Sequence, residues 1–96
     1  MPQINKPKKK RISAGDSREI RQKIYGTVRW RSLRRAHLME HPLCERCLSF
    51  GTVTPAEDVH HVVPFMKAGD TLSRRQLAYD PENLQSLCRK CHTELH

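Results

Sequence analysis

The segment Val59-His60-His61-Val62-Val63-Pro64, together with Cys88-Arg89-Lys90-Cys91-His92 near the end of the chain, decides how this sequence can fold. The first segment places two adjacent histidines in a short run of β-branched residues, which favours a strand. The second places a histidine directly after a Cys-x-x-Cys pair, the spacing at which two cysteines bind one metal ion. We expect the cysteines to build a metal-bound scaffold and the histidines to form a separate, open metal site on it.

The cysteines form two pairs of this kind, Cys44 with Cys47 and Cys88 with Cys91. Four thiolates can bind one tetrahedral zinc ion in a closed site, and closed sites of this kind are structural. A redox dithiol would use one pair and leave the other unexplained. Disulfides are a further alternative, but the chain opens with a basic run and not with an apolar leader segment. We therefore expect reduced thiolates in a cytoplasmic protein.

The composition predicts one small domain that needs such a staple. The chain has 96 residues, of which 36% are hydrophobic and 5% aromatic, so its core is small. No segment approaches the roughly 20 apolar residues that cross a bilayer, and we expect no membrane partner. The net charge of +8 and the pI of about 9.8 predict a polyanionic partner, with nucleic acid as the first candidate.

The first part of the chain differs from the rest. Residues 1–16 contain the basic run Lys6-Pro7-Lys8-Lys9-Lys10-Arg11 and almost nothing apolar, which predicts a flexible basic arm. This arm either contacts phosphates or is a solvated tail. From Asp16, which is suited to cap a short helical turn, apolar residues recur, and we assign residues 17–96 to one domain.

A longer helix is predicted at about 27–41, capped by Thr27 and ended before Pro42. Trp30 and Leu33 share its apolar face, while its arginines lie on other faces and either contact phosphates or are solvated. The remaining elements are predicted in chain order: a turn around Gly51, a strand at 57–63, a long irregular connection from Pro64 to Pro81, a strand at 83–87 and a helix from Cys88 onward.

Side-chain geometry separates the roles of the histidines. Neighbours on a strand point to opposite faces, so one of His60 and His61 can bind an ion while the other faces a substrate. His92 and His96 are four positions apart and therefore share one face of a helix. A set of His60, His92 and His96 would leave coordination positions open to water and phosphate, as a catalytic metal site requires.

Together these residues resemble the signature of the HNH endonucleases, and of the small phage-type members most of all. The likeness covers roughly Leu43 to His96 and is carried by His60-His61, by Asn83, and by His92 behind the last cysteine pair. It implies the ββα-metal fold of that family. The predicted fold is then a small α+β domain stapled by zinc, with a treble-clef-like ββα core at about 57–96, zinc knuckles at 44–47 and 88–91, an N-terminal helix and a basic arm.

The resemblance also implies a role for each matching residue. His61 matches the general base. His60 and His92 match ligands of one catalytic divalent ion, and His96 matches a third ligand found in some members. Asn83 matches the asparagine that orients the base and its loop. Imidazole ligands suit Mn²⁺, Ni²⁺, Co²⁺ or Zn²⁺, whereas the family also works with Mg²⁺, so the ion is left open. Five basic residues are either phosphate contacts or solvated charges: Lys67, Arg74, Arg75, Arg89 and Lys90.

The expected function is that of a divalent-metal-dependent DNA endonuclease of low sequence specificity, which nicks or cuts and leaves 5′-phosphate and 3′-hydroxyl ends. Family analogy adds the phage DNA-packaging terminase as a partner, and a bacterial or phage-infected cytoplasm as the location. The alternative is a non-catalytic, zinc-bound nucleic-acid-binding module in which the histidines are incidental. His61 separates the two hypotheses, because only the endonuclease needs it. The sequence does not decide the oligomeric state.

Overall fold

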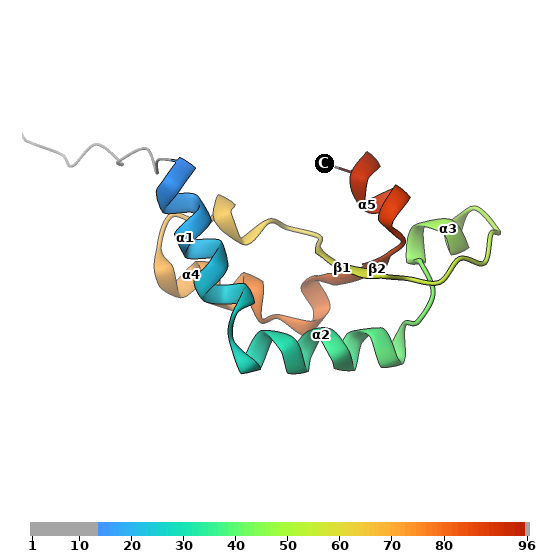
Figure 1. Ribbon diagram of the computed structural model, residues 1–96, viewed down its shortest axis with the longest axis horizontal. Helices are drawn as coiled ribbons and strands as arrows, with labels where there is room; N and C mark the ends of the chain where they lie inside the picture. The colour runs from blue at the N-terminus through green and yellow to red at the C-terminus, as the bar shows by residue number, and fades with distance from the viewer. Residues whose placement is uncertain (1–13, 96) are drawn as a thin grey trace, which may run out of the picture.

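The computed structural model describes residues 14–95, with side chains from residue 17 onward. One antiparallel pair of strands lies at the centre, helices gather at both of its ends, and the longest helix runs alongside (Figure 1). This arrangement confirms the predicted α+β class. The elements in chain order are α1 (Ala14–Tyr25), α2 (Val28–Glu40), α3 (Glu45–Ser49), β1 (Asp58–His61), η1 (Phe65–Lys67), α4 (Thr71–Ala78), η2 (Pro81–Asn83), β2 (Leu84–Leu87) and α5 (Arg89–Glu94).

The start of α2 follows the sequence prediction. The side chain of Thr27 accepts a hydrogen bond of 3.1 Å from the backbone N–H of Trp30, which satisfies one of the N–H groups left open at a helix start. The helix ends at Glu40, before Pro42. Trp30 is buried against the sheet side, so the apolar face of α2 is part of the core, as its spacing predicted.

The start of α1 differs from the prediction. This helix begins at Ala14, before the Asp16 that we expected to cap it, so residues 14–16 of the predicted arm are helical. Asp16 therefore lies within the first turn of the helix and does not precede it. The rest of the predicted arm, residues 1–13, lies outside the described residues.

The two strands are shorter than predicted, but each lies within its predicted range. In the antiparallel register Asp58 lies opposite Leu87 and His61 lies opposite Leu84. Beyond the pair of His61 and Leu84, the backbone N–H of Val62 donates a hydrogen bond of 2.9 Å to the carbonyl of Asn83. The catalytic candidates of β1 are thus held at the end of a ladder whose other strand leads directly into Cys88 and α5.

The connection from Pro64 to Pro81 was wrongly predicted to be irregular. It contains the helix α4 between two 3-10 turns. Asp70 caps α4 by accepting hydrogen bonds from the backbone N–H and the hydroxyl of Ser73, at 2.8 and 2.9 Å. The Asp-x-x-Ser signal was present in the sequence, but a short helix of mixed composition lacks the long apolar periodicity that reveals one.

The core consists of two small clusters, one at each end of the sheet. Leu87 and the cysteines form the first. Ile24, Phe65 and Ala78 form the second, which joins α1 to α4 and the loop after β1. Neither cluster is large, in keeping with the lean composition. Within residues 14–95, none of the helices has the length and apolar character needed to cross a membrane.

Candidate metal centres and active site

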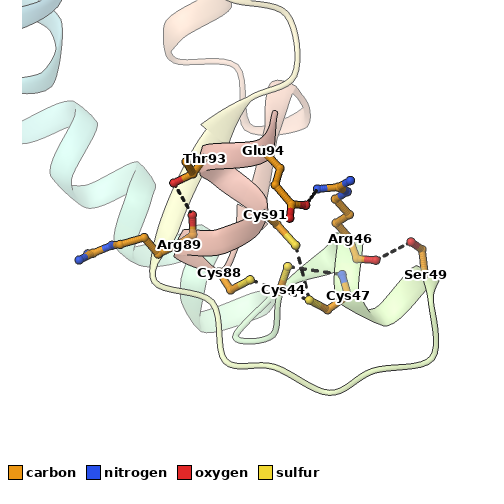
Figure 2. Close-up of polar contacts among 9 residues, drawn as sticks. All are labelled: Cys44, Arg46, Cys47, Ser49, Cys88, Arg89, Cys91, Thr93 and Glu94. Carbon is orange, nitrogen blue, oxygen red and sulfur yellow. Dashed lines mark hydrogen bonds and ion pairs between the residues drawn. The ribbon is translucent and has the colours of Figure 1, made fainter. Parts of the chain in front are cut away.

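The four cysteines meet between α3 and α5 (Figure 2). Their sulfur atoms all lie within 4.8 Å of one another, and the Sγ of Cys47 is 3.8 Å from that of Cys88 and 3.6 Å from that of Cys91. Four sulfurs around one zinc ion, each about 2.3 Å from it, would be about 3.8 Å apart. The residues present therefore fit a tetrahedral thiolate site, and the chain has a metal-binding cluster of four cysteines.

Local structure brings the two cysteine pairs to this point. Cys44 precedes α3, and its Sγ accepts a hydrogen bond of 3.4 Å from the backbone N–H of Cys47. Cys88 stands in the same position before α5. Beside the cluster Arg46 and Glu94 form an ion pair of 2.7 Å that joins the two helices (Figure 2). Each Cys-x-x-Cys pair is thus held by the first turn of a short helix.

The pKa values of two of these thiols move apart. Burial opposes ionisation of Cys44, but hydrogen bonds from its neighbours outweigh burial and lower its pKa to about 6. Burial and the hydrogen bonds with the other three cysteines raise the pKa of Cys91 to about 12. Once Cys44 is a thiolate, its negative charge therefore opposes ionisation of Cys91. A bound cation would favour the ionised form of all four thiols and so lower their pKa values.

Three histidines and an aspartate line a cavity of about 490 Å³, to which α5 contributes His92. His60 and His61 reach it from β1 and His92 from α5, so the structure brings together three of the histidines that the sequence singled out. The remaining wall comes from α1, α2 and the loop after β1. The full lining is Arg21, Tyr25, Trp30, Arg34, Asp58, Val59, His60, His61, Pro64, Phe65, Met66 and His92.

His61 lies deep in this cavity and is only 6% exposed. Its Nε2 is 3.0 Å from the carbonyl oxygen of Ala78, which can only accept, so Nε2 carries the proton and Nδ1 is the basic atom of the neutral ring. The ring stacks on Trp30, with centroids 4.9 Å apart, and meets the edge of Phe65 at 5.0 Å. Burial lowers the pKa of His61, with a smaller opposing effect from the Ala78 carbonyl. His61 is therefore neutral near pH 7.

His60 and His92 lie on the outer side of the cavity, with ring centroids 5.4 Å apart. Two imidazoles that bind one ion through nitrogens about 2.1 Å away would place their centroids about 5 Å apart at a tetrahedral angle. The Oδ2 of Asp58 lies 3.1 Å from Nδ1 of His92, so Nε2 is the ring nitrogen of His92 that can bind an ion. These residues fit a divalent cation. Among residues 17–95 they do not form a closed donor set like that of the cysteines.

Asn83 lies outside the cavity and joins the segments around His61. Its Oδ1 accepts from the N–H of Val63 at 2.8 Å, and its Nδ2 donates to the carbonyls of Val63 and Leu77, both at 2.9 Å. Val63 lies two residues after His61, and Leu77 precedes the Ala78 whose carbonyl holds the His61 ring. The buried amide of Asn83 therefore holds in place the two segments that position His61, namely the end of β1 and the end of α4.

The five basic residues that the resemblance nominated do not line the cavity, and their assignment as DNA contacts stays a prediction. Arg74 and Arg75 on α4 line a hollow between α4 and α1, and Arg89 and Lys90 lie beside the cysteine cluster. Lys67 is exposed on η1. His96 lies outside the described residues.

Sequence reasoning missed several residues of the cavity. Asp58 lies two positions before His60 on the same strand, so the period of two could have placed both on one face. Trp30 was assigned to the core alone, although its indole also supports His61. Arg34 was only one of several helix arginines offered as possible phosphate contacts, and Arg21 had no sequence signal, because packing against β1 is what brings both to the cavity.

The fold and the cavity agree with a known family of nucleases. The family model for HNH endonucleases matches residues 44–96, which is more than half of the chain. The chain therefore belongs to the HNH endonuclease family and is a nuclease.

Among solved structures, the crystal structure of the deep-sea thermophilic bacteriophage GVE2 HNH endonuclease with manganese ion is similar, with 32% identity and a TM-score of 0.64. The match covers 84% of this chain and 86% of that one. A comparison with curated proteins gave no match. This similar structure extends beyond the family model and includes part of the region before Cys44.

Proposed function

We propose that this protein hydrolyses phosphodiester bonds of DNA in the histidine cavity, with His61 as the general base and a divalent ion bound by His60 and His92. The observation that carries the proposal is the convergence of these three side chains on one open cavity. The resemblance to phage-type HNH endonucleases supports the same assignment. Low sequence specificity belongs to the proposal, since no base-reading element stands out in the sequence.

His61 supplies the proton transfer. Its neutral ring accepts a proton from the attacking water at Nδ1, while Nε2–H stays bonded to the carbonyl of Ala78. That hydrogen bond and the stacked Trp30 hold the ring in one orientation. Because burial disfavours the charged ring, His61 is unprotonated when the reaction starts and returns its proton readily afterwards.

Asp58 and His92 prepare the cation site. The carboxylate accepts the Nδ1–H of His92, which fixes the tautomer and turns Nε2 toward an ion. A bound divalent cation supplies positive charge for the phosphate and for the leaving oxygen. The manganese ion named with the GVE2 structure supports Mn²⁺ as one candidate, while Mg²⁺, Ni²⁺, Co²⁺ and Zn²⁺ stay open. For the four cysteines we propose Zn²⁺, because a closed thiolate tetrahedron suits it best.

The test is a plasmid-cleavage assay over a panel of divalent ions, with EDTA as the metal-free condition. Wild-type protein should convert supercoiled plasmid to nicked or linear DNA when a divalent ion is added. His61→Ala should lower the rate by a factor of about 10² to 10⁴, the usual contribution of a general base. Circular dichroism and zinc content establish that the variant is folded.

His41→Ala is the matched control, because His41 is an exposed histidine that does not line the cavity. It should cleave at the wild-type rate. If folded His61→Ala cuts as fast as wild type, the catalytic assignment is wrong. If no ion supports cleavage but the protein binds DNA, the alternative of a zinc-bound nucleic-acid-binding module holds instead.

A place in phage DNA packaging beside the terminase extends the proposal, and so does action in the cytoplasm of an infected cell. Both rest on analogy with phage-type members, supported by the phage origin of the similar structure. A packaging assay with purified terminase tests the first of these. Addition of the wild-type protein should increase the yield of packaged DNA, and folded His61→Ala should not.

A further inference from the structure

A second hollow, of about 340 Å³, lies on the outer side of α2. It is lined by Arg31, Arg34, Arg35, Leu38 and Met39, and we call this surface the arginine face. Arg34 also lines the histidine cavity. The two hollows therefore adjoin at this one side chain, and the arginine face continues the wall of the cavity along α2.

The spacing of these arginines suits consecutive phosphates. Arg31, Arg34 and Arg35 are related as i, i+3 and i+4, so they share one side of the helix. Four residues of helix rise by about 6 Å, a length comparable with neighbouring phosphates on a strand. Guanidinium groups bind phosphate oxygens through paired N–H donors, which makes arginine the preferred residue for such contacts.

Two of the three guanidinium groups are already held in place by backbone carbonyls. Arg34 donates from Nη2 to the carbonyl of Glu57 at 2.8 Å, and Arg31 donates from Nη1 to that of Gly26 at 3.0 Å. Each guanidinium has five N–H donors, so several remain for a ligand. Because these side chains are held before a ligand arrives, binding costs less conformational entropy.

The charge on this surface is not neutralised by nearby carboxylates. Among the side chains of residues 17–95, no ion pair involves Arg21 or any arginine of the arginine face. Elsewhere arginines are paired, as Arg46 is with Glu94 and Arg89 with Glu57. Uncompensated positive charge that runs into a phosphodiester-cleaving cavity attracts a polyanion along that path.

We infer that the arginine face binds the phosphate backbone of the DNA next to the phosphate being cleaved, with Arg21 on α1, which also lines the cavity, contacting the same strand. This inference rests on the proposed function. It adds a DNA-binding surface on α2, which lies outside the ββα core. Contacts with phosphates carry no sequence information, so the arginine face would position the DNA without selecting a sequence.

The experiment measures the salt dependence of DNA binding by fluorescence anisotropy, with a labelled 30-base-pair duplex and no divalent ion added, and with intact DNA verified on a gel. Each lost phosphate contact should reduce the slope of log K against log salt concentration by about 0.9. Arg31→Gln and Arg35→Gln should each show this reduction and weaken binding at low salt. In the cleavage assay both should raise KM more than they lower kcat.

Lys23→Gln is the matched control, since Lys23 is an exposed helical residue of equal charge that pairs with Glu19 and lines neither hollow. It should keep the wild-type slope. An unchanged slope in Arg31→Gln and Arg35→Gln, while wild type still cuts DNA, overturns the inference and leaves the proposed function intact. An equal change in Lys23→Gln overturns it too, because the effect would then be one of net charge. A wild-type protein that neither binds nor cuts DNA overturns the proposed function itself.

Discussion

The cysteine cluster and the histidine cavity lie at different faces of one short helix, α5. Cys91 and His92 are neighbours on α5, yet Cys91 is buried among sulfur atoms while His92 faces an open cavity. The cluster has four donors within 4.8 Å of one another, enough to fill a tetrahedral site without a substrate or water ligand. The cavity has two imidazoles 5.4 Å apart and a volume of about 490 Å³ beside them.

This difference suggests a division of labour in a small domain, in which the cysteine cluster stabilises the fold and the open histidine cavity is left for a ligand. A closed thiolate site contributes its binding energy to folding, and it can hold α5 rigidly because nothing else has to enter it. The open site then uses that rigid helix to place His92 opposite His60. Because α5 contributes Cys91 to the cluster and His92 to the cavity, we expect loss of the cluster to disturb the cavity, and changes confined to the cavity to leave the cluster intact. Variants of the two regions should therefore have different effects.

The largest effect is expected from removal of one cysteine. Cys44→Ser should unfold the domain, because the metal contributes on the order of 10 kcal/mol and the remaining core is small. Far-UV circular dichroism and measurement of bound zinc test this. A variant that is folded and free of zinc would show that the cluster is not the staple of this fold.

A smaller effect on stability is expected from the residue that connects α2 to the cavity. Trp30→Ala removes a buried side chain that stacks on His61, and it should lower the free energy of unfolding by about 3 to 5 kcal/mol. Trp30→Phe keeps an aromatic ring and should lose much less. Chemical denaturation measures both. An alanine variant as stable as wild type would mean that α2 contributes little to the packing around His61.

Replacement of the carboxylate that holds His92 should affect the cavity alone. Asp58→Asn should weaken binding of the catalytic ion about 10- to 100-fold, because His92 loses its orienting partner. Binding of Mn²⁺ followed by calorimetry measures this, and the melting temperature should stay close to that of wild type. If the variant binds Mn²⁺ as tightly as wild type, Asp58 does not orient His92 for ion binding.

The smallest effect concerns pH. Burial lowers the pKa of His61, so the unprotonated base should persist as the pH falls through about 6.5, and the cleavage rate should decline only below that value. By the same linkage, the stability that His61 contributes is complete above about pH 6.5 and is lost as the pH falls from there toward its folded-state pKa. A rate profile from pH 5 to 8 tests this. A decline that begins above pH 6.5 would contradict a buried base.

The sequence alone determined the elements that depend on local spacing. The two Cys-x-x-Cys pairs predicted the metal-binding cluster. Thr27 predicted the start of α2 for the same reason, since a helix cap is a contact between near neighbours. The period of two predicted opposite faces for His60 and His61, whereas both side chains line one cavity, with His61 the more deeply buried. The helix α4 escaped prediction because it is short and half exposed, so its apolar pattern is weak.

Only the tertiary structure decided which distant side chains share the cavity. The packing of α2 against the sheet places Trp30 on the ring of His61 and brings Arg34 to the wall, and α5 carries His92 to Asp58. These contacts join residues separated by more than twenty positions, and no periodicity records such a pairing. Spacing along the chain selects the ligands, whereas the packing of helices on the two strands decides which of them can act together.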